Sequence, residues 1–220
     1  GTASPESEAA AAEMNAYFLQ RINHLRRNPN NHLLGQLVAI ETEDGRLDDE
    51  ELLSFCRLLL IAGNETTTGL ITASARIFHE EPQTLAQIKQ RPELSGAFVE
   101  EALRYYSPFS ATVRRTTKDV ELAGQTIGAG ELVVPLIASA NRDERVFDAP
   151  DTFVMERSPN PHLGMGFGIH FCLGAHLARL EGKIVVEQMA ERYAQVVLAN
   201  PEKAAIGDLG GPKELAVILG

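Results

Sequence analysis

Residues 164–174 constrain the fold of this chain more than any other segment. They read Gly-Met-Gly-Phe-Gly-Ile-His-Phe-Cys-Leu-Gly, and the cysteine at position 172 comes just before an amphipathic stretch that predicts a helix. Alternating glycines let a backbone turn tightly and come close to a flat partner. A thiol at a helix N-terminus is stabilised as thiolate, the form of cysteine that binds metal. Taken alone, the pattern is also typical of a buried cysteine behind a flexible glycine loop.

The same segment resembles the haem-binding signature of the cytochrome P450 haem-thiolate monooxygenases, Phe-Gly-x-Gly-x-His-x-Cys-x-Gly. Residues 165–174 match every defined position except the first, where methionine replaces phenylalanine. The resemblance implies heme b (iron protoporphyrin IX) as the cofactor and Cys172 as the axial ligand of its iron. Because the thioether of Met165 is apolar and adaptable, we expect haem binding to be retained with altered redox tuning.

Other residues of the segment have cofactor-binding roles that the resemblance implies. His170 is expected to hydrogen-bond a haem propionate. The glycines expected to shape the loop below the haem are Gly166, Gly168 and Gly174. A zinc site made of His170, Cys172 and His176 is disfavoured, because zinc normally takes four protein ligands and no second cysteine is near.

Residues 48–78 predict the longest helix of the chain, which at 1.5 Å per residue would span about 45 Å. Asp48, with Glu51 three residues later, indicates a capping arrangement at its start. Residues 62–67, Ala-Gly-Asn-Glu-Thr-Thr, form a polar island of small residues in the middle. We expect this island to distort the helix locally, because glycine disfavours helix and threonine bonds back to the preceding turn. From the residues alone, a close helix contact and a functional groove explain it equally well.

The island is similar to the Ala/Gly-Gly-x-Asp/Glu-Thr-Thr/Ser motif on the oxygen-binding side of the same family. The resemblance implies that Ala62 and Gly63 leave room for dioxygen beside the iron. It also implies that Thr66 holds the hydrogen bonds that deliver protons, and that Glu65 relays protons from outside.

Glu101 and Arg104 match the family's Glu-x-x-Arg pattern. Such a pair on a helix is usually solvated, but the resemblance implies a buried ion pair behind the haem-binding loop. The third partner in the family is commonly an arginine before a phenylalanine. Here Thr152 precedes Phe153, so the sequence leaves open which group completes the set.

The resemblance implies that an arginine in residues 112–116 pairs with a haem propionate, and the spacing to Asp119 favours Arg114 over Arg115. A planar guanidinium suits a carboxylate. An arginine pair that only serves solubility at a strand edge is the alternative. Segments similar to those that line the family's substrate pocket are apolar and imply an apolar substrate. They are Leu58, Leu59, Ala62, residues 109–113 and the turn at residues 207–211.

The predicted fold is mainly α with small β sheets, similar to the C-terminal half of the cytochrome P450 fold. We expect one incomplete domain over residues 1–220, made of four parts. They are a helical part (1–106), small sheets with an irregular segment (107–161), the haem-binding loop with the following helix (162–194) and a C-terminal β segment (195–220). The predicted helices are 7–28, 32–42, 48–78, 82–90, 93–106 and 173–190. The predicted strands are 112–116, 120–122, 125–127, 131–135, 196–198 and 215–219.

Composition excludes several other classes. The net charge of −10 argues against a nucleic-acid partner, because phosphate binding needs a basic face. The two cysteines, Cys56 and Cys172, are too few for a disulfide framework, and Cys56 is expected to be a small core residue. No apolar run is long enough for a membrane helix, so we expect no membrane partner and a cytoplasmic location.

The function that the resemblance implies is hydroxylation or epoxidation of an apolar small molecule, using dioxygen and two electrons from NAD(P)H. A ferredoxin-type carrier would deliver the electrons. By position, candidate docking residues for that carrier are Arg104, Arg157, Arg179 and Lys183, with solvated surface charge as the favoured alternative for each. Because the match covers only half of the family's length, we expect the chain to be a fragment, and an inert haem-binding or structural module is the main alternative. A peroxide-driven enzyme ranks last, because the acid and threonine pair usually replaced in that subclass is intact here.

Overall fold

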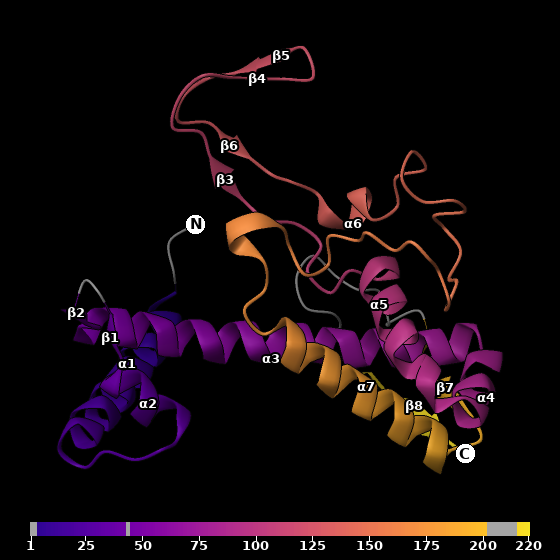
Figure 1. Cartoon of the computed structure of the whole chain (residues 1–220), viewed down its shortest axis with the longest axis horizontal. Helices are drawn as coiled ribbons and strands as arrows, with labels where there is room; N and C mark the ends of the chain where they lie inside the picture. The colour runs from indigo at the N-terminus through magenta and orange to yellow at the C-terminus, as the bar shows by residue number, and fades with distance from the viewer. Residues whose placement is uncertain (1–3, 43–44, 202–214) are drawn as a thin grey trace. The chain divides into compact units, whose positions relative to one another are not determined.

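The computed structural model describes residues 4–42, 45–201 and 215–220. The chain forms two compact units, Gly1–Gly63 and Asn64–Gly220. The longest helix, α3 (Asp49–Glu80), continues across the boundary between them (Figure 1).

The first unit contains α1 (Pro5–Arg27), α2 (Leu33–Ala39) and a short antiparallel pair, β1 (Glu41–Thr42) with β2 (Gly45–Arg46). Ser4 caps α1, since its hydroxyl oxygen accepts the N–H of Ser7 at 3.2 Å. The helices α1 and α2 pack on each other, and Ile22 and Leu25 of α1 are buried. The expected extension of the second helix to residue 42 is wrong. The backbone becomes extended at Ile40 and continues into β1.

The predicted cap of α3 is confirmed. The N–H of Asp48 donates to Oε2 of Glu51 at 2.9 Å, and the N–H of Glu51 donates to Oδ1 of Asp48 at 2.8 Å. The polar island does not interrupt the helix, and every residue from 49 to 80 is α-helical. Thr68, the residue just after the island, donates to the carbonyl of Asn64 at 2.9 Å, and this back-bond leaves the helix continuous.

The second unit is built on four helical segments: the rest of α3, α4 (Gln83–Gln90), α5 (Ser95–Tyr105) and α7 (Ala175–Arg192). The 3-10 turn η1 (Pro92–Leu94) joins α4 to α5. The helix α7 packs against both α4 and α5. A Cβ at Gly182 of α7 would lie 2.7 Å from Cδ2 of Leu70, so glycine lets α7 come close to α3. Phe78 and Phe98 stack in the core with ring centroids 4.9 Å apart.

In the described part of this unit, the strands form three two-stranded antiparallel sheets. They are β3 (Arg114–Arg115) with β6 (Leu132–Val133), β4 (Val120–Leu122) with β5 (Gln125–Ile127), and β7 (Val196–Leu198) with β8 (Val217–Leu219). The helical turn α6 (Ile137–Ala140) was not expected. The predicted class, mainly α with small β sheets, is confirmed. The turn at residues 207–211 lies outside the described residues.

No helix in the described part of the chain combines the length and the apolar character that crossing a membrane requires.

Candidate functional site

The cysteine loop, residues 163–174, turns back on itself through its glycines. Gly166 and Gly168 have φ angles of +75° and +65°, which L side chains rarely adopt. A Cβ at Gly166 would also lie 3.0 Å from the carbonyl oxygen of His170. The 3-10 turn η2 (Gly168–His170) forms the tip. The N–H of Cys172 donates to the carbonyl of Met165 at 2.8 Å and closes the base of the loop.

The thiol of Cys172 is exposed and forms no disulfide, whereas Met165 at the opposite side of the loop base is buried in the core. Residues between and beside them expose large apolar side chains; Phe167 is 84% exposed and Ile169 is 97% exposed. Apolar side chains gathered on one surface mark a place where another body binds. An exposed thiol beside apolar side chains and closely approachable glycines fits a large, flat, apolar group whose iron takes a thiolate ligand. The residues present therefore fit haem.

A zinc site gains no support from the geometry. Among the described residues, no group of three or more histidine, cysteine, aspartate or glutamate side chains is placed to hold a metal ion.

The entrance of the loop is pressed against α5. A Cβ at Gly164 would lie 2.9 Å from the carbonyl oxygen of Leu103 and 3.1 Å from Nδ1 of His162. The N–H of Leu163 donates to Oδ1 of the buried Asn141 at 2.7 Å. The loop therefore begins at a fixed position on α5 and on the irregular segment, residues 141–161.

Gly164→Ala is expected to lower the free energy of unfolding by about 1–3 kcal/mol, because the new methyl group would overpack against a backbone carbonyl that cannot rotate away. Chemical denaturation measures the change. Gly96→Ala is the matched control, because Gly96 is an exposed position of α5 with no described neighbour within 4 Å of its added Cβ, and alanine favours helix. Equal effects of the two substitutions would contradict the close packing at Gly164.

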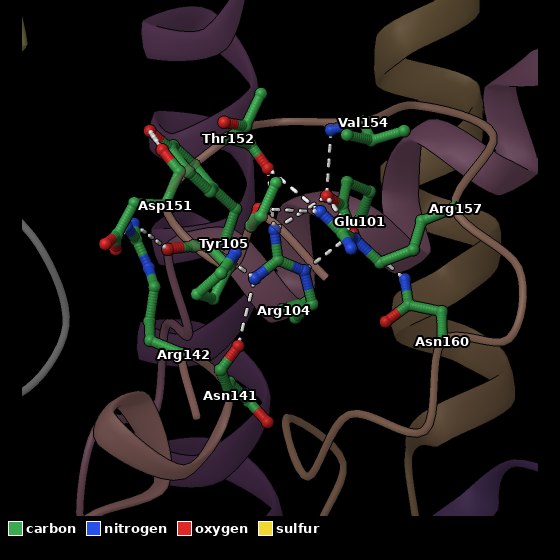
Figure 2. A network of polar contacts seen from close by, with 12 residues as sticks. Glu101, Arg104, Tyr105, Asn141, Arg142, Asp151, Thr152, Val154, Arg157 and Asn160 are labelled. Atoms are coloured by element: carbon green, nitrogen blue, oxygen red, sulfur yellow. Dashed lines mark hydrogen bonds and ion pairs between the residues drawn. The ribbon is translucent and has the colours of Figure 1, made fainter. Parts of the chain in front are cut away.

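Behind the loop, Glu101 and Arg104 form an ion pair with both side chains fully buried (Figure 2). Nε and Nη2 of Arg104 donate to the two carboxylate oxygens at 2.8 and 2.7 Å. The other N–H groups of Arg104 donate to the carbonyls of Asn141, Pro150 and Thr152 at 3.0, 2.8 and 3.0 Å. All five donors of the guanidinium are used. The predicted burial is confirmed, and a solvated pair is excluded.

Arg157 is the third member of this network. Its Nε donates to Oε1 of Glu101 at 3.0 Å, and its side chain is 8% exposed (Figure 2). Asn160 and the N–H of Val154 also donate to the carboxylate of Glu101, at 3.1 and 2.9 Å. Thr152 occupies the position at which the family commonly has the third partner, and it contributes only its carbonyl. The sequence did hold a signal, since Arg157 is the one arginine between Phe153 and the cysteine loop.

The expected docking roles of Arg104 and Arg157 are wrong, because both guanidinium groups are enclosed by the network around Glu101. Arg179 is held bidentately by Glu100 and is one-third exposed. Lys183 is about half exposed, 3.8 Å from Glu187, and its docking role stays a prediction.

Glu100, next to Glu101 on α5, was missed by the sequence reasoning. Its carboxylate accepts from Nε and Nη2 of Arg179 at 2.6 and 2.9 Å, and its Oε2 lies 3.0 Å from Nε2 of His162. The N–H of Gly164 donates to Nδ1 of His162 at 3.1 Å, so the proton of the imidazole is on Nε2 and donates to Glu100. Burial acts to raise the pKa of Glu100, but the hydrogen bonds from His162 and Arg179 outweigh it and lower that pKa to about 2.

The predicted propionate partners are both exposed. His170 lies in η2, and Arg114 lies in β3, where its Nη1 donates to the hydroxyl of Thr112 at 2.8 Å. Arg115 instead donates to the carbonyl of Gly130. Neighbouring residues of a strand face opposite sides, so the two arginines serve different surfaces. The choice of Arg114 stays a prediction.

The predicted oxygen-side residues all lie on α3. Ala62 and Gly63 end the first unit and are exposed, and no described atom lies within 4 Å of a Cβ built at Gly63. In the second unit, Glu65 is exposed and Thr66 is half-buried. The adjacent Thr67 donates to Oε2 of Glu181 on α7 at 3.2 Å, which ties α3 to the helix that follows the cysteine loop.

A family model described as Cytochrome P450 matches residues 74–204, more than half of the chain. The chain is 41% identical over 197 residues to the biotin biosynthesis cytochrome P450 of Bacillus subtilis (strain 168), covering 90% of this chain and 50% of that protein. CYP109E1 from Bacillus megaterium in complex with testosterone superposes with a TM-score of 0.90 and 39% identity, over 97% of this chain and 60% of that one.

A further solved structure, P450BioI in complex with an acyl carrier protein ligated to hexadec-9Z-enoic acid, has a TM-score of 0.90 and 37% identity. The superposition covers 100% of this chain and 58% of the P450BioI chain. The chain therefore spans between half and three-fifths of the length of these relatives.

Proposed function

Because the chain belongs to the cytochrome P450 family, we propose that it provides the thiolate side and part of the oxygen side of a haem-thiolate monooxygenase acting on apolar small molecules. The observation that carries the proposal is the exposed thiol of Cys172, in a loop fixed on α5 and closed at its base by Met165. Bound haem would supply the activation of dioxygen, with one oxygen atom inserted into a C–H or double bond of the substrate and the other leaving as water.

The residues of the loop would hold and orient the cofactor. Cys172 would donate electron density to the iron, and the backbone at Gly166 and Gly168 would lie flat against the porphyrin. His170 and Arg114, both exposed, would bind the propionates by charge-assisted hydrogen bonds. Phe167 and Ile169 would keep water away from the sulfur.

On the oxygen side, Glu65 and Thr66 would move protons. The exposed carboxylate of Glu65 can exchange protons with solvent, and the half-buried hydroxyl of Thr66 would hold the hydrogen bonds through which they reach the reacting oxygen. Ala62 and Gly63, without bulky side chains, would leave space for dioxygen.

The relatives support the proposed substrate class, and the electron source is proposed from the family resemblance. The testosterone of the CYP109E1 complex and the hexadecenoyl group of the P450BioI complex are both largely apolar. We extend to this chain an apolar small-molecule substrate, with two electrons from NAD(P)H through a ferredoxin-type carrier.

The deciding experiment is the absorption spectrum of the haem-loaded, reduced protein under carbon monoxide. A strongly red-shifted haem band supports thiolate ligation by Cys172. Absence of any bound haem supports the alternative of an inert structural module, which the half-length match to the relatives favours. Haem binding with the red-shifted band but without turnover supports an inert haem-binding fragment.

Thr66→Ala is expected to lower the product formed per NAD(P)H consumed by about tenfold or more. Without the hydroxyl, the hydrogen bonds that deliver protons to the reacting oxygen are lost. Product and NAD(P)H consumption are measured together with a ferredoxin system. Thr68→Ala is the matched control, because the hydroxyl of Thr68 is exposed and bonds back to the carbonyl of Asn64. Equal coupling in the two variants would contradict the role of Thr66.

A further inference from the structure

The carboxylate of Glu100 joins three segments that surround the cysteine loop. Glu100 belongs to α5, His162 lies at the entrance of the loop, and Arg179 lies on α7, the helix into which the loop runs. The contacts span 62 and 79 residues of sequence, so this one side chain holds together parts of the chain that no local structure connects. Glu101, one residue later, is directed instead to the irregular segment (Figure 2).

His162 passes the restraint to the loop backbone. Its side chain is 3% exposed, and its two nitrogens bind Glu100 on one side and the N–H of Gly164 on the other. Gly164 in turn lies against the carbonyl of Leu103. Weakening the bond from His162 to Glu100 would therefore loosen the first residues of the loop.

Arg179 forms the second arm. Its bidentate hydrogen bond to Glu100 fixes the direction of the guanidinium. That hydrogen bond raises the pKa of Arg179 against the effect of burial. Arg179 is the fifth residue of α7, seven positions after Cys172, so the fixed cation lies on the helix that the cysteine loop leads into.

We propose that Glu100 is a positioning residue for Cys172, which fixes the loop entrance through His162 and holds Arg179 as a fixed cation near the start of α7, the helix that follows the cysteine loop. The effect on the loop concerns the protein without cofactor. The effect on the sulfur's electron donation rests on the function proposed above.

The two effects predict different signatures. Glu100→Gln removes a negative charge and leaves Arg179 uncompensated, so it favours the more negative, reduced state of a bound iron and raises its reduction potential. Arg179→Gln removes the positive charge and lowers that potential. A merely structural ion pair would loosen the loop in both variants without this opposition of sign.

The loop is tested by hydrogen exchange on the cofactor-free chain. Glu100→Gln is expected to speed exchange of the amides in residues 163–174 by about tenfold or more, because the hydrogen bonds that Glu100 accepts from His162 and Arg179 are weakened. Glu156→Gln is the matched control: it also removes a long-range bidentate partner of an arginine, Arg91, but on the exposed surface. Equal exchange in the two variants overturns the positioning role. If Glu100→Gln does not fold, Glu100→Asp, whose shorter side chain cannot reach both partners, carries the same expectation.

The electrostatic part is tested by potentiometric titration of the haem-loaded protein. Opposite shifts in Glu100→Gln and Arg179→Gln, with the wild-type value largely restored in Arg179→Lys, are the expected result. Shifts of the same sign, or none, overturn it. If the wild-type protein shows no thiolate-type band, the proposed function fails, while the exchange experiment still decides whether Glu100 positions the loop.

Discussion

Cys172→Ala is expected to abolish the red-shifted band of the reduced carbon monoxide complex completely, while the fold is retained. The thiol is exposed, so its removal leaves no cavity in the core and breaks none of the backbone bonds that close the loop. Loss of the sulfur removes the only proposed thiolate donor to the iron. The spectrum of haem-loaded protein and the thermal unfolding midpoint of cofactor-free protein are the two measurements.

Cys56→Ala is the control for this experiment. Cys56 is buried on α3, and burial raises the pKa of its thiol, so it stays a neutral core group. This variant should retain the band. In the cofactor-free native protein, a thiol reagent should modify Cys172 and leave Cys56 unmodified until unfolding, and haem should protect Cys172. A red-shifted band that survives in Cys172→Ala would refute the assignment of the ligand.

Arg104→Met is expected to cost about 3–5 kcal/mol of unfolding free energy, because it leaves the carboxylate of Glu101 buried with only part of its charge compensation. Three carbonyl oxygens of residues 141, 150 and 152 also lose a donor. Denaturant titration followed by circular dichroism measures the change. The irregular segment and the cysteine loop should unfold together, because Asn141 contacts both Arg104 and Leu163.

Arg104→Lys separates charge from geometry. Lysine keeps the positive charge but has three donors and no planar fork, so it should recover only part of the lost stability. Arg145→Ala is the control, since Arg145 is 85% exposed and paired at the surface with Asp143. The unfolding midpoint of this variant should equal that of the wild type. Full rescue by Arg104→Lys would mean that the positive charge alone holds the irregular segment, and not the five hydrogen bonds that the guanidinium donates.

Much of the fold was predictable because local signals mark it. Strands β4 and β5 were predicted to the residue, since Ala123 and Gly124 form a tight turn with positive φ between two short β-rich runs. The start of α3 was predictable from the spacing of Asp48 and Glu51. The end of α2 was not, because Ile40 suits strand as well as helix and the pairing of β1 with β2 decides.

For the candidate site, the motifs located the residues but not their partners. The resemblance to the family's motifs identified Cys172 and the Glu101–Arg104 pair, whereas Arg157 reaches Glu101 across 56 residues and Glu100 reaches Arg179 across 79. The docking roles predicted for Arg104 and Arg157 were wrong because charge in a sequence carries no information on burial. Contacts of such long range arise only when helices and loops are placed in space.

The guanidinium groups of Arg104 and Arg157 hold the irregular segment by its backbone oxygens, at residues 141, 148, 149, 150 and 152. Recognition of this kind is indifferent to which side chains the segment bears at positions 148 and 152. Relatives can therefore diversify that surface during evolution while the scaffold beneath the sulfur stays the same, whereas an inserted or deleted residue there would move every oxygen out of register.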